Sequence, residues 1–325
     1  MRAGRTEMTM AFDKNSTAAE VVAGHDLTGK EVIVTGGASG LGAETARVLA
    51  LAGARVVVAG RDAGRGEAAV RRLREETGNR AVEFSELDLG SLASVRAFTE
   101  RYAATGRSLH LLINNAGVMA SPLTYTEDGF ESQFGTNHLG HFALTAGLRP
   151  ALAAAGGGAR VVALSSRAHR RGDIDLDDPN YRHRPYDPWE SYGQSKSANA
   201  LFAVELTERW ATDGITANAL NPGAIMTDLQ RHIATGELQD MGWADADGNR
   251  ITPQGWKTVE QGAATTIWAA VAPELEGVGG HYLDDCAIAT PWTADDQPPF
   301  GHYLARILDP ERAERLWTLS EKLIG

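Results

Sequence analysis

A tyrosine and a lysine stand four positions apart in the segment SYGQSKSANALF, as Tyr192 and Lys196. At 3.6 residues per turn, this spacing places both side chains on one face of a helix. An ammonium group about 4 Å from a phenol, at an effective dielectric constant of about 20, contributes roughly 4 kcal/mol, or about three pKa units. Such a pair can bring a tyrosine hydroxyl into the pKa range that acid–base catalysis requires. Because a Tyr-x-x-x-Lys pair also arises by chance on helix surfaces, its meaning depends on the rest of the chain.

Seven short apolar segments predict the strands that would position this pair. They are continuously apolar rather than alternating, as is typical of strands buried on both faces of a sheet. The segments cover residues 31–36, 55–60, 81–89, 109–117, 160–166, 216–223 and 280–285. Amphipathic helical stretches separate them, and this regular alternation predicts right-handed βαβ units and a parallel sheet. The expected fold is a single α/β, doubly wound (Rossmann) domain of about seven strands, over residues 29–325.

Three segments interrupt the alternation of strands and helices. Residues 1–28 form an N-terminal extension, in which TAAEVVAG predicts a short helix. Residues 167–191 are polar and contain three prolines, and residues 228–260 contain Trp243 and Trp256. Loops of this length inside a compact domain are usually functional, so both are expected to shape a substrate site. The two tryptophans either line that site or pack their loop onto the sheet.

The composition is that of a globular protein and excludes several classes of function. A net charge of −11 argues against binding to nucleic acid or to an anionic membrane, because both require a basic surface. No run of about 18 apolar residues is present, so no membrane span is expected. The first ten residues have no apolar leader, and Met8 and Met10 are alternative first residues. A single cysteine, Cys286, leaves no internal disulfide and fits a reducing compartment, so a cytoplasmic location is expected.

Two patterns superficially resemble metal sites. His138 and His141 have helical spacing, but no third ligand is evident, and packing or surface histidines are expected. The run of Asp173, Asp175 and Asp177 lacks the glycine and the glutamate that complete a calcium loop. No metal site is therefore expected in this chain.

The segment TGGASGLG connects the first predicted strand to the first long helix. Its glycines permit a tight turn and a close approach of the backbone to a pyrophosphate, whose charge the helix N-terminus stabilises. In this position between strand and helix the turn predicts a dinucleotide site. The residues expected to bind the cofactor there are Gly36, Ser39, Gly40, Leu41 and Gly42.

The ends of the second and third strands indicate which nucleotide binds. The second strand ends in Gly60-Arg61 rather than in an acidic residue. An arginine suits the 2′-phosphate of NADP, so NADP(H) is expected as the preferred cofactor, with NAD(H) as the alternative. Asp88, followed by Leu89, ends the third strand and is placed to accept from the adenine amino group. Its alternative role is to cap the turn before Ser91.

Further polar motifs fall at the carboxyl ends of the predicted strands, where ligands of a doubly wound sheet bind. These are NNAG at 114–117, Ser165-Ser166 and NPG at 221–223. With TGGASGLG, Asn137 and YGQSK, they resemble the short-chain dehydrogenase/reductase family from about residue 25 to about residue 290. The details FGTNHLGHFAL, SSRAH and STAAEVVAG are most similar to its retinol-dehydrogenase-like and WW-domain-oxidoreductase-like branch. Ser166 and Tyr192 lie about twice as far apart as is usual in the family, which leaves substrate size and identity open.

The resemblance implies an NADP(H)-preferring alcohol dehydrogenase or carbonyl reductase, in which Tyr192 is the acid/base for hydride transfer at the nicotinamide. Ser166 would orient the substrate oxygen, with Ser165 as the alternative serine. Lys196 would also hold the nicotinamide ribose hydroxyls, and Asn137 would hold a water that resupplies protons. The remaining cofactor contacts implied by the family are Asn115, Ala116, Gly117, Pro222, Gly223, Ile225 and Thr227, beside Tyr192 and Lys196.

The expected substrate is a small apolar molecule, such as a polyketide, terpenoid, steroid-like or retinoid carbonyl or its alcohol. Family members are often dimers or tetramers, so a homodimer or homotetramer is implied. Two other functions remain open on the same scaffold. One is reduction of a carbon–carbon or carbon–nitrogen double bond, and the other is nucleotide sensing by a protein without catalysis.

Overall fold

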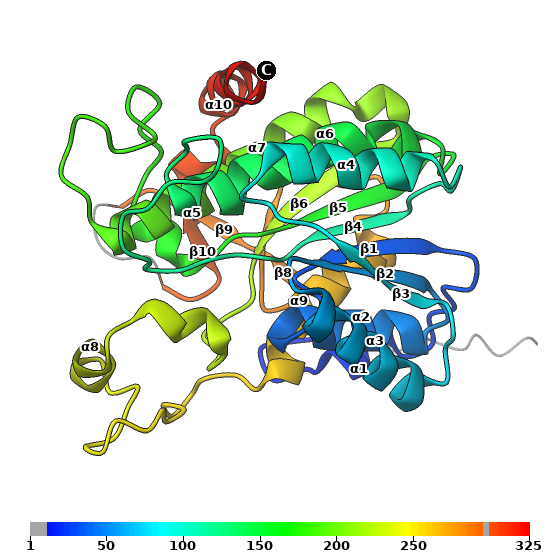
Figure 1. Ribbon diagram of the computed structural model, residues 1–325, viewed down its shortest axis with the longest axis horizontal. Coiled ribbons are helices and arrows are strands. Elements are labelled where there is room, and N and C mark those ends of the chain that lie inside the picture. Colours follow the sequence, from blue (N-terminus) through cyan, green and yellow to red (C-terminus); the bar gives the residue numbers. More distant parts are fainter. Residues whose placement is uncertain (1–11, 295–298) are drawn as a thin grey trace, which may run out of the picture.

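The computed structural model describes residues 12–294 and 299–325, so Met8 and Met10 lie outside the described residues. An eight-stranded sheet forms its centre, in the order β3-β2-β1-β4-β5-β6-β7-β8 (Figure 1). The chain enters at β1 and reverses direction across the sheet between β1 and β4, as in a doubly wound fold. The strands are β1 (Glu31–Thr35), β2 (Arg55–Gly60), β3 (Val82–Glu86), β4 (Leu111–Asn114), β5 (Ala159–Leu164), β6 (Ile215–Asn221), β7 (Tyr282–Asp284) and β8 (Ala287–Ile288).

Strands β1 to β7 are parallel, which confirms the predicted sheet. Strand β8 is an addition, because it pairs antiparallel with β7 through a two-residue turn. Both turn residues, Asp285 and Cys286, have positive φ (49° and 58°), as a type I′ hairpin requires. The usual Asn-Gly or Asp-Gly signal of such a turn is missing here, so the sequence pattern does not reveal it.

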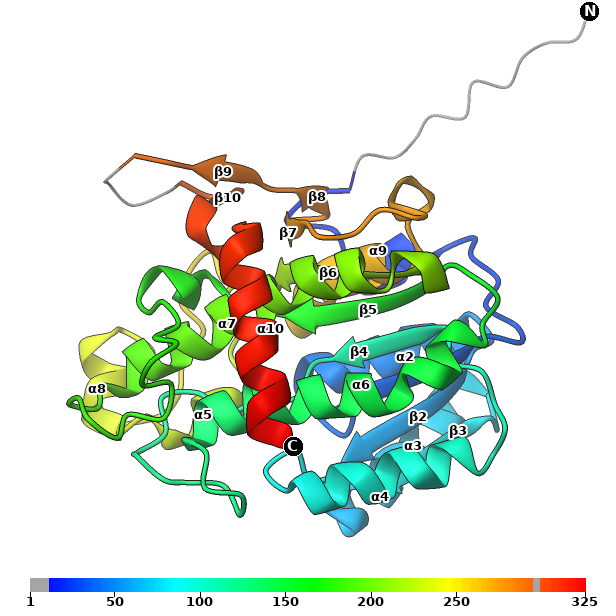
Figure 2. The same cartoon turned by 90° about the horizontal axis from the view of Figure 1, so that it is seen from above.

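Helices cover both faces of the sheet (Figures 1 and 2). Val32 and Val34 of β1 point into the core on one face and Ile33 into the core on the other, which explains the continuously apolar strands. The first face carries α1 (Ala18–Val22), α2 (Gly40–Leu51), α3 (Ala63–Thr77) and α9 (Val259–Val271). The second face carries α4 (Leu92–Ala103), α6 (Gly140–Ala153), α7 (Pro188–Arg209) and α10 (Pro310–Ile324).

The predicted helix in the N-terminal extension is α1. Thr17 and Glu20 form a reciprocal capping box at its start. Val21 and Val22 are buried in the same core as α9, so this part of the extension packs on the sheet domain. The domain boundary at residue 28 stays a prediction.

Helix α7 carries the Tyr–Lys pair and begins at Pro188, one turn before Tyr192. Asp187 caps it by accepting from the backbone N–H groups of Trp189 and Glu190, and proline suits the first helical position. From Ser191 to Ala203 the helix is buried on all sides, because it lies between the sheet and α10. The predicted loop 167–191 therefore ends inside this helix.

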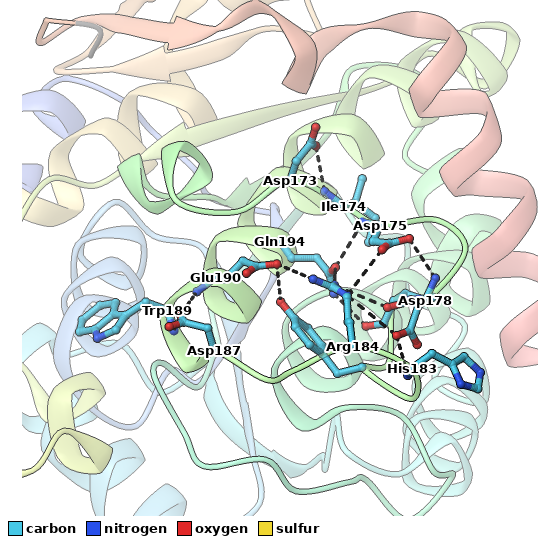
Figure 3. A network of polar contacts seen from close by, with 12 residues as sticks. Asp173, Ile174, Asp175, Asp178, His183, Arg184, Asp187, Trp189, Glu190 and Gln194 are labelled. Atoms are coloured by element: carbon cyan, nitrogen blue, oxygen red, sulfur yellow. Dashed lines mark hydrogen bonds and ion pairs between the residues drawn. The ribbon is translucent and has the colours of Figure 1, made fainter. Parts of the chain in front are cut away.

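The loop 167–191 begins with the short helix η2 (Arg167–Arg170). A network of ion pairs and hydrogen bonds orders the part of the loop that follows η2 (Figure 3). Arg184 donates to the Gln194 side chain at 2.7 Å and pairs with Glu190 and Asp175. Asp173 pairs with two arginines of the C-terminal region, Arg306 and Arg312, at 3.2 and 2.8 Å. Asp173, Asp175 and Glu190 of this segment thus face guanidinium groups.

The second predicted loop, 228–260, forms a lobe beside α7 that contains η4 (Asp228–His232) and α8 (Thr235–Asp240) (Figure 1). Beyond residue 285 the structure adds β9 (Thr290–Trp292) and β10 (His302–Leu304), which pair with each other, and then η6 (Ala305–Leu308) before α10. Among the helices described, none is both long and apolar enough to cross a membrane. The remaining short helical elements are α5 (Ser132–Phe134), η1 (Gly135–Leu139), η3 (Ala211–Asp213) and η5 (Pro273–Leu275).

Candidate active site

A cavity of about 540 Å³ opens at the carboxyl ends of the central strands. It has an adenosine end beside β2 and β3 and a chemical end beside α7, named here for the groups they are expected to hold. Of the predicted site residues, its lining includes Gly36, Ser39, Gly40, Leu41, Gly42, Arg61, Asp88, Leu89, Asn115, Ala116, Gly117, Tyr192, Lys196, Pro222 and Thr227. Gly223, Ile225, Asn137 and Ser166 are outside this lining.

The glycine turn between β1 and α2 has the backbone that its sequence predicts. Gly36 and Gly40 have positive φ (66° and 54°), where other residues are strained. A Cβ atom at Gly42 would lie 2.4 Å from the Gly36 carbonyl oxygen, so this glycine allows α2 to pack on the turn. Ser39, the N-cap residue of α2, makes no side-chain capping bond. The Ser39 side chain therefore leaves the first N–H groups of α2 available at the edge of the cavity. An anion at this helix start needs such donors.

The NNAG segment after β4 supports this turn. Asn115 donates its side-chain amide to the Thr35 carbonyl at 2.7 Å, and the Asn115 and Ala116 N–H groups donate to the Thr35 hydroxyl at 2.9 Å. The Asn115 side chain thus joins two strand ends while its residue lines the cavity. Ile225 packs instead against α9, since a Cβ atom at Gly262 would lie 2.6 Å from its side chain.

Asp88 both lines the cavity and holds a turn. Its carboxylate accepts from the Gly90 N–H at 2.8 Å, while Ser91 itself caps α4. The two roles expected for Asp88 are therefore compatible.

Three arginines line the adenosine end: Arg61 after β2, Arg65 in α3 and Arg231 in η4. Arg65 pairs with Asp228 at 3.5 Å. Burial, together with the positive charges of Arg61 and Arg65, lowers the pKa of Arg231. Arg231 was not predicted from the sequence, because it comes from the lobe, more than 160 residues after Arg65.

At the chemical end, Tyr192 and Lys196 lie on one face of α7, as their spacing predicts. Their exposed fractions are 5% and 4%. The Lys196 ammonium lies 5.4 Å from the centre of the Tyr192 ring and donates to the Leu164 carbonyl at 2.9 Å. The pair therefore lies in a nearly dry site at the end of β5.

Asn137 lies in the π-helical turn η1 and is fully buried beside Lys196. Its amide donates to the Val118 carbonyl and to the Ser195 hydroxyl, both at 2.9 Å, and accepts from the Val118 N–H. A Cβ atom at Gly117 would lie 3.1 Å from the Asn137 amide oxygen and 3.8 Å from the Lys196 nitrogen, so the three positions adjoin. Asn137 thus links the loop after β4 to α7.

The two serines after β5 point in different directions. Ser165 donates to the Lys196 carbonyl at 2.7 Å and is buried. The Ser166 hydroxyl accepts from the Ala168 N–H at 3.1 Å and lies close enough to Tyr192 to oppose the rise in the tyrosine pKa. Of the two alternatives, Ser166 is the serine that the structure brings to the tyrosine hydroxyl.

The pKa values of the pair are governed by burial. Burial raises the pKa of Tyr192 well above its ordinary value, although the hydrogen bond with Ser166 opposes this shift. Burial also lowers the pKa of Lys196 to about 8. In the chain alone, the expected lowering of the tyrosine pKa by the lysine is thus absent, because desolvation outweighs an ammonium group that is directed at the Leu164 carbonyl.

His138 and His141 are buried packing residues, as expected. His138 contacts the Ser320 hydroxyl at 2.9 Å, and His141 bridges the Asn137 carbonyl and the Thr35 hydroxyl, each at 2.9 Å. Burial lowers their pKa values to about 3 and about 4. Both are therefore neutral at pH 7. His141 also joins the glycine turn to the helix of Asn137, a connection that their spacing alone does not indicate.

Apolar side chains of the lobe pack in one cluster with Tyr192. The buried members of this cluster are Met119, Ala120, Tyr192, Ile233, Leu238 and Ala244. Trp243 packs against it and lies between Trp189, at 6.2 Å, and Trp256, at 4.9 Å between ring centres. Trp189 donates to Glu237 of α8 at 2.6 Å, which joins the start of α7 to the lobe.

Comparisons with known proteins agree with this geometry. The chain is 48% identical to a probable oxidoreductase of Streptomyces antibioticus, over 90% of this chain and 96% of the relative. It is 45% identical to polyprenol dehydrogenase of Mus musculus (91% and 84% covered) and 41% identical to retinol dehydrogenase 12 of the same species (92% and 87%). These relatives confirm the predicted branch. A crystal structure of an uncharacterised protein from Mycobacterium paratuberculosis matches with a TM-score of 0.68 and 38% identity, over 95% of this chain and 97% of that one.

The family model of the short chain dehydrogenases matches residues 30–238, which include the glycine turn, Asn137, Ser166, Tyr192 and Lys196. The match covers more than half of the chain, and the relatives cover most of the remainder. This chain is an oxidoreductase that belongs to the short-chain dehydrogenase family.

Proposed function

We propose that this oxidoreductase interconverts a carbonyl group and an alcohol, that NADP(H) is its preferred cofactor, and that Tyr192 is the acid/base. One observation carries the proposal. A single cavity joins a glycine turn with an uncapped helix start to a buried Tyr–Lys pair, and Ser166 lies close enough to the tyrosine to affect its pKa. The first end suits a dinucleotide phosphate, and the second suits proton transfer at a substrate oxygen.

The residues present fit a nicotinamide dinucleotide. The cavity volume falls within the range of about 300–1,000 Å³ that is usual for cofactor sites. Gly36, Gly40 and Gly42 leave space and backbone donors for a pyrophosphate, and Arg61 lies where a 2′-phosphate would be bound. When bound, NADP(H) supplies or accepts the hydride.

Side chains of the protein carry out the proton transfer and position the substrate. In reduction, the Tyr192 hydroxyl donates its proton to the carbonyl oxygen as the carbon gains a hydride, and in oxidation the phenolate takes that proton back. Ser166 orients the substrate oxygen by a hydrogen bond. Lys196 holds the nicotinamide ribose and stabilises the phenolate. Asn137, which adjoins Lys196, holds a water that returns protons to the site.

The raised pKa of Tyr192 affects whether the protein is better prepared for reduction or for oxidation. A neutral phenol is ready to donate a proton, so the chain alone is prepared for reduction. Oxidation requires the phenolate, and a bound oxidised nicotinamide would supply a positive charge that, with Lys196, would favour it. We therefore expect the oxidation rate to rise with pH above neutrality, whereas the reduction rate should not fall until the pH exceeds about 10, because the raised pKa keeps the phenol protonated.

The substrate we propose is apolar. Met119, Ile233 and Leu238 pack in one apolar cluster with Tyr192, and these side chains offer no charged group to a substrate. Two relatives are named for polyprenol and retinol, which are apolar alcohols. A terpenoid, polyketide, steroid-like or retinoid carbonyl fits these walls. We also propose that the protein acts in the cytoplasm as a homodimer or homotetramer, which its molar mass in solution would test.

The test combines a panel of apolar ketones, aldehydes and alcohols with the variant Tyr192→Phe. Turnover should fall by about 10³-fold or more, since general acid–base catalysis contributes about 10² to 10⁴. NADPH affinity should stay within a few-fold. Tyr125→Phe is the matched control, because Tyr125 is exposed and outside the cavity, and it should keep full activity.

Comparable turnover in Tyr192→Phe would remove the proposed role. Product analysis separates the alternative reactions, because a saturated carbon–carbon bond or an amine would identify a different reduction on this scaffold. Binding of NADPH without turnover of any compound would indicate a nucleotide-sensing protein.

A further inference from the structure

The lobe of residues 228–260 reaches the adenosine end of the cavity as well as Tyr192. Its first element, η4, contributes Asp228, Leu229 and Arg231 to the cavity lining. A Cβ atom at Gly40 would lie 3.6 Å from the side chain of Thr227, which caps η4. The lobe therefore starts against the glycine turn.

Positive charge accumulates where η4 faces α3. Arg61, Arg65 and Arg231 line this end with two carboxylates, Asp62 and Asp228. Asp62 accepts from the Arg65 N–H at 2.9 Å as the cap of α3, and Asp228 pairs with the Arg65 side chain at 3.5 Å. Burial lowers the pKa of His232, and the positive charges of Arg231 and Arg61 add to this shift. Among the described residues, this end of the cavity thus has three guanidinium groups and two carboxylates. Both carboxylates bind Arg65, one through its backbone N–H and the other through its side chain.

We propose that Arg231 binds the 2′-phosphate of NADP(H) together with Arg61. This inference rests on the proposed function and adds a second phosphate-binding residue from another part of the chain. A phosphate monoester carries nearly two negative charges at pH 7, and two planar guanidinium groups can neutralise it through paired hydrogen bonds. Like charges that repel one another at a cavity wall are stabilised when such an anion lies between them.

A consequence for the substrate side follows from the position of Arg231 in the lobe. Ile233, two residues later, and Leu238 of α8 belong to the apolar cluster around Tyr192. A phosphate held by Arg231 would therefore fasten the lobe to the nucleotide half of the molecule. NAD(H), which has no 2′-phosphate, would leave the lobe without this attachment. The substrate KM should accordingly be lower with NADPH than with NADH.

The test measures the affinities of NADPH and NADH by quenching of tryptophan fluorescence in the wild type, Arg231→Ala and Arg231→Lys. Arg231→Ala should weaken NADPH by about 10- to 100-fold, as expected for a charge-assisted hydrogen bond, and NADH by less than about two-fold. Arg231→Lys should restore part of the loss, because it keeps the charge. Arg71→Ala is the matched control, since Arg71 is exposed on α3 outside the cavity, and it should change neither affinity.

Asp228→Asn should act in the opposite direction. It removes a negative charge beside the phosphate position and releases Arg65, so NADPH should bind a few-fold more tightly while NADH is unchanged. A fragment probe gives a second readout, because 2′,5′-ADP should compete with NADPH more strongly than 5′-AMP in the wild type but not in Arg231→Ala. Circular dichroism checks that each variant is folded.

The outcomes separate this inference from the proposed function. If Arg231→Ala keeps the wild-type ratio of NADPH to NADH affinity, or weakens both equally, Arg231 does not bind the 2′-phosphate, while the oxidoreductase proposal is unaffected. If the wild type binds neither nucleotide, the proposed function itself fails. If Arg231→Ala lowers NADPH affinity but leaves the substrate KM unchanged with both cofactors, the attachment of the lobe is overturned.

Discussion

At the adenosine end of the cavity, Arg61, Arg65 and Arg231 are exposed and keep their charges in contact with solvent. At the chemical end, Tyr192 and Lys196 are almost completely buried, and burial shifts both of their pKa values towards the neutral form. Exposed charges require little desolvation and can serve affinity directly. Buried groups whose uncharged form is favoured can exchange protons with a substrate, but they need a further charge nearby to ionise. The two ends therefore suit different tasks: the exposed arginines suit binding, and the buried pair suits the proposed proton transfer.

The largest effect among these variants is expected for Lys196→Met. This variant tests whether the buried lysine increases turnover while it lowers the free energy of unfolding. Turnover should fall by about 10² to 10⁴. Burial lowers the lysine pKa from 10.5 to about 8, so below pH 8 the folded state holds an ammonium group that desolvation disfavours. The variant removes that penalty, and its free energy of unfolding at pH 7 should rise by about 1 to 3 kcal/mol.

The sign of this effect can be checked against pH. Between pH 8 and 10.5 the unfolded wild type binds more protons than the folded wild type, so wild-type stability rises with pH and the advantage of the variant should shrink. The Leu164 carbonyl keeps Asn199 as a donor at 3.0 Å, so no acceptor is left unpaired. Urea denaturation at several pH values measures this, with Lys30→Met, an exposed lysine, as control. A less stable Lys196→Met at pH 7 would contradict the argument.

A pair of variants sharpens the assignment within the chemical end. Ser166→Ala should lower kcat/KM by about 10²-fold or more, because it removes the hydroxyl that we propose orients the reacting oxygen. Ser165→Ala should instead lower the unfolding free energy by about 1–3 kcal/mol, because its hydroxyl donates to the buried Lys196 carbonyl, and should affect activity less. The reverse result would make Ser165 the serine that contacts substrate. Steady-state kinetics and denaturation on both variants decide between them.

The adenosine end should respond through affinity alone. Arg61→Ala should raise the KM for NADPH by about ten-fold, the equivalent of about 1.4 kcal/mol, while the KM for NADH and both kcat values change little. Kinetics with each cofactor measure the difference. Equal losses with the two cofactors would show that this arginine does not distinguish the phosphate, and a loss in kcat would weaken the division between the ends.

The smallest expected effect concerns the lobe that spans both ends. Trp189→Phe keeps an aromatic ring but removes the donor to Glu237, so the lobe should be held less firmly over Tyr192. The KM for an apolar substrate should change by about two- to five-fold, since a hydrogen bond to a carboxylate contributes roughly 1.5–3 kcal/mol and much of it is retained by packing. NADPH affinity should stay the same. Trp256→Phe is the control, because Trp256 packs on Trp243 without contacting Glu237.

Most of the sheet and the core of the candidate site were predictable from local patterns. The seven parallel strands follow from apolar runs, and the glycine turn follows from residues that must adopt positive φ at Gly36 and Gly40. Tyr192 and Lys196 share a face because a helix places positions four apart together, whatever surrounds it. The turn of β8 was not predictable, because Asp285 and Cys286 adopt positive φ without the usual glycine.

The sequence by itself determined which groups could exchange a proton and where a nucleotide phosphate would lie, because both depend on short-range geometry. Tertiary structure alone decided the pKa values of those groups and which residues from distant parts of the chain surround them. Ile233 and Leu238, some 40 residues from Tyr192 along the chain, help to exclude water from it, and Arg231 meets Arg61 only through the packing of the lobe. Desolvation and charge proximity act through space, and residue spacing along the chain does not report them.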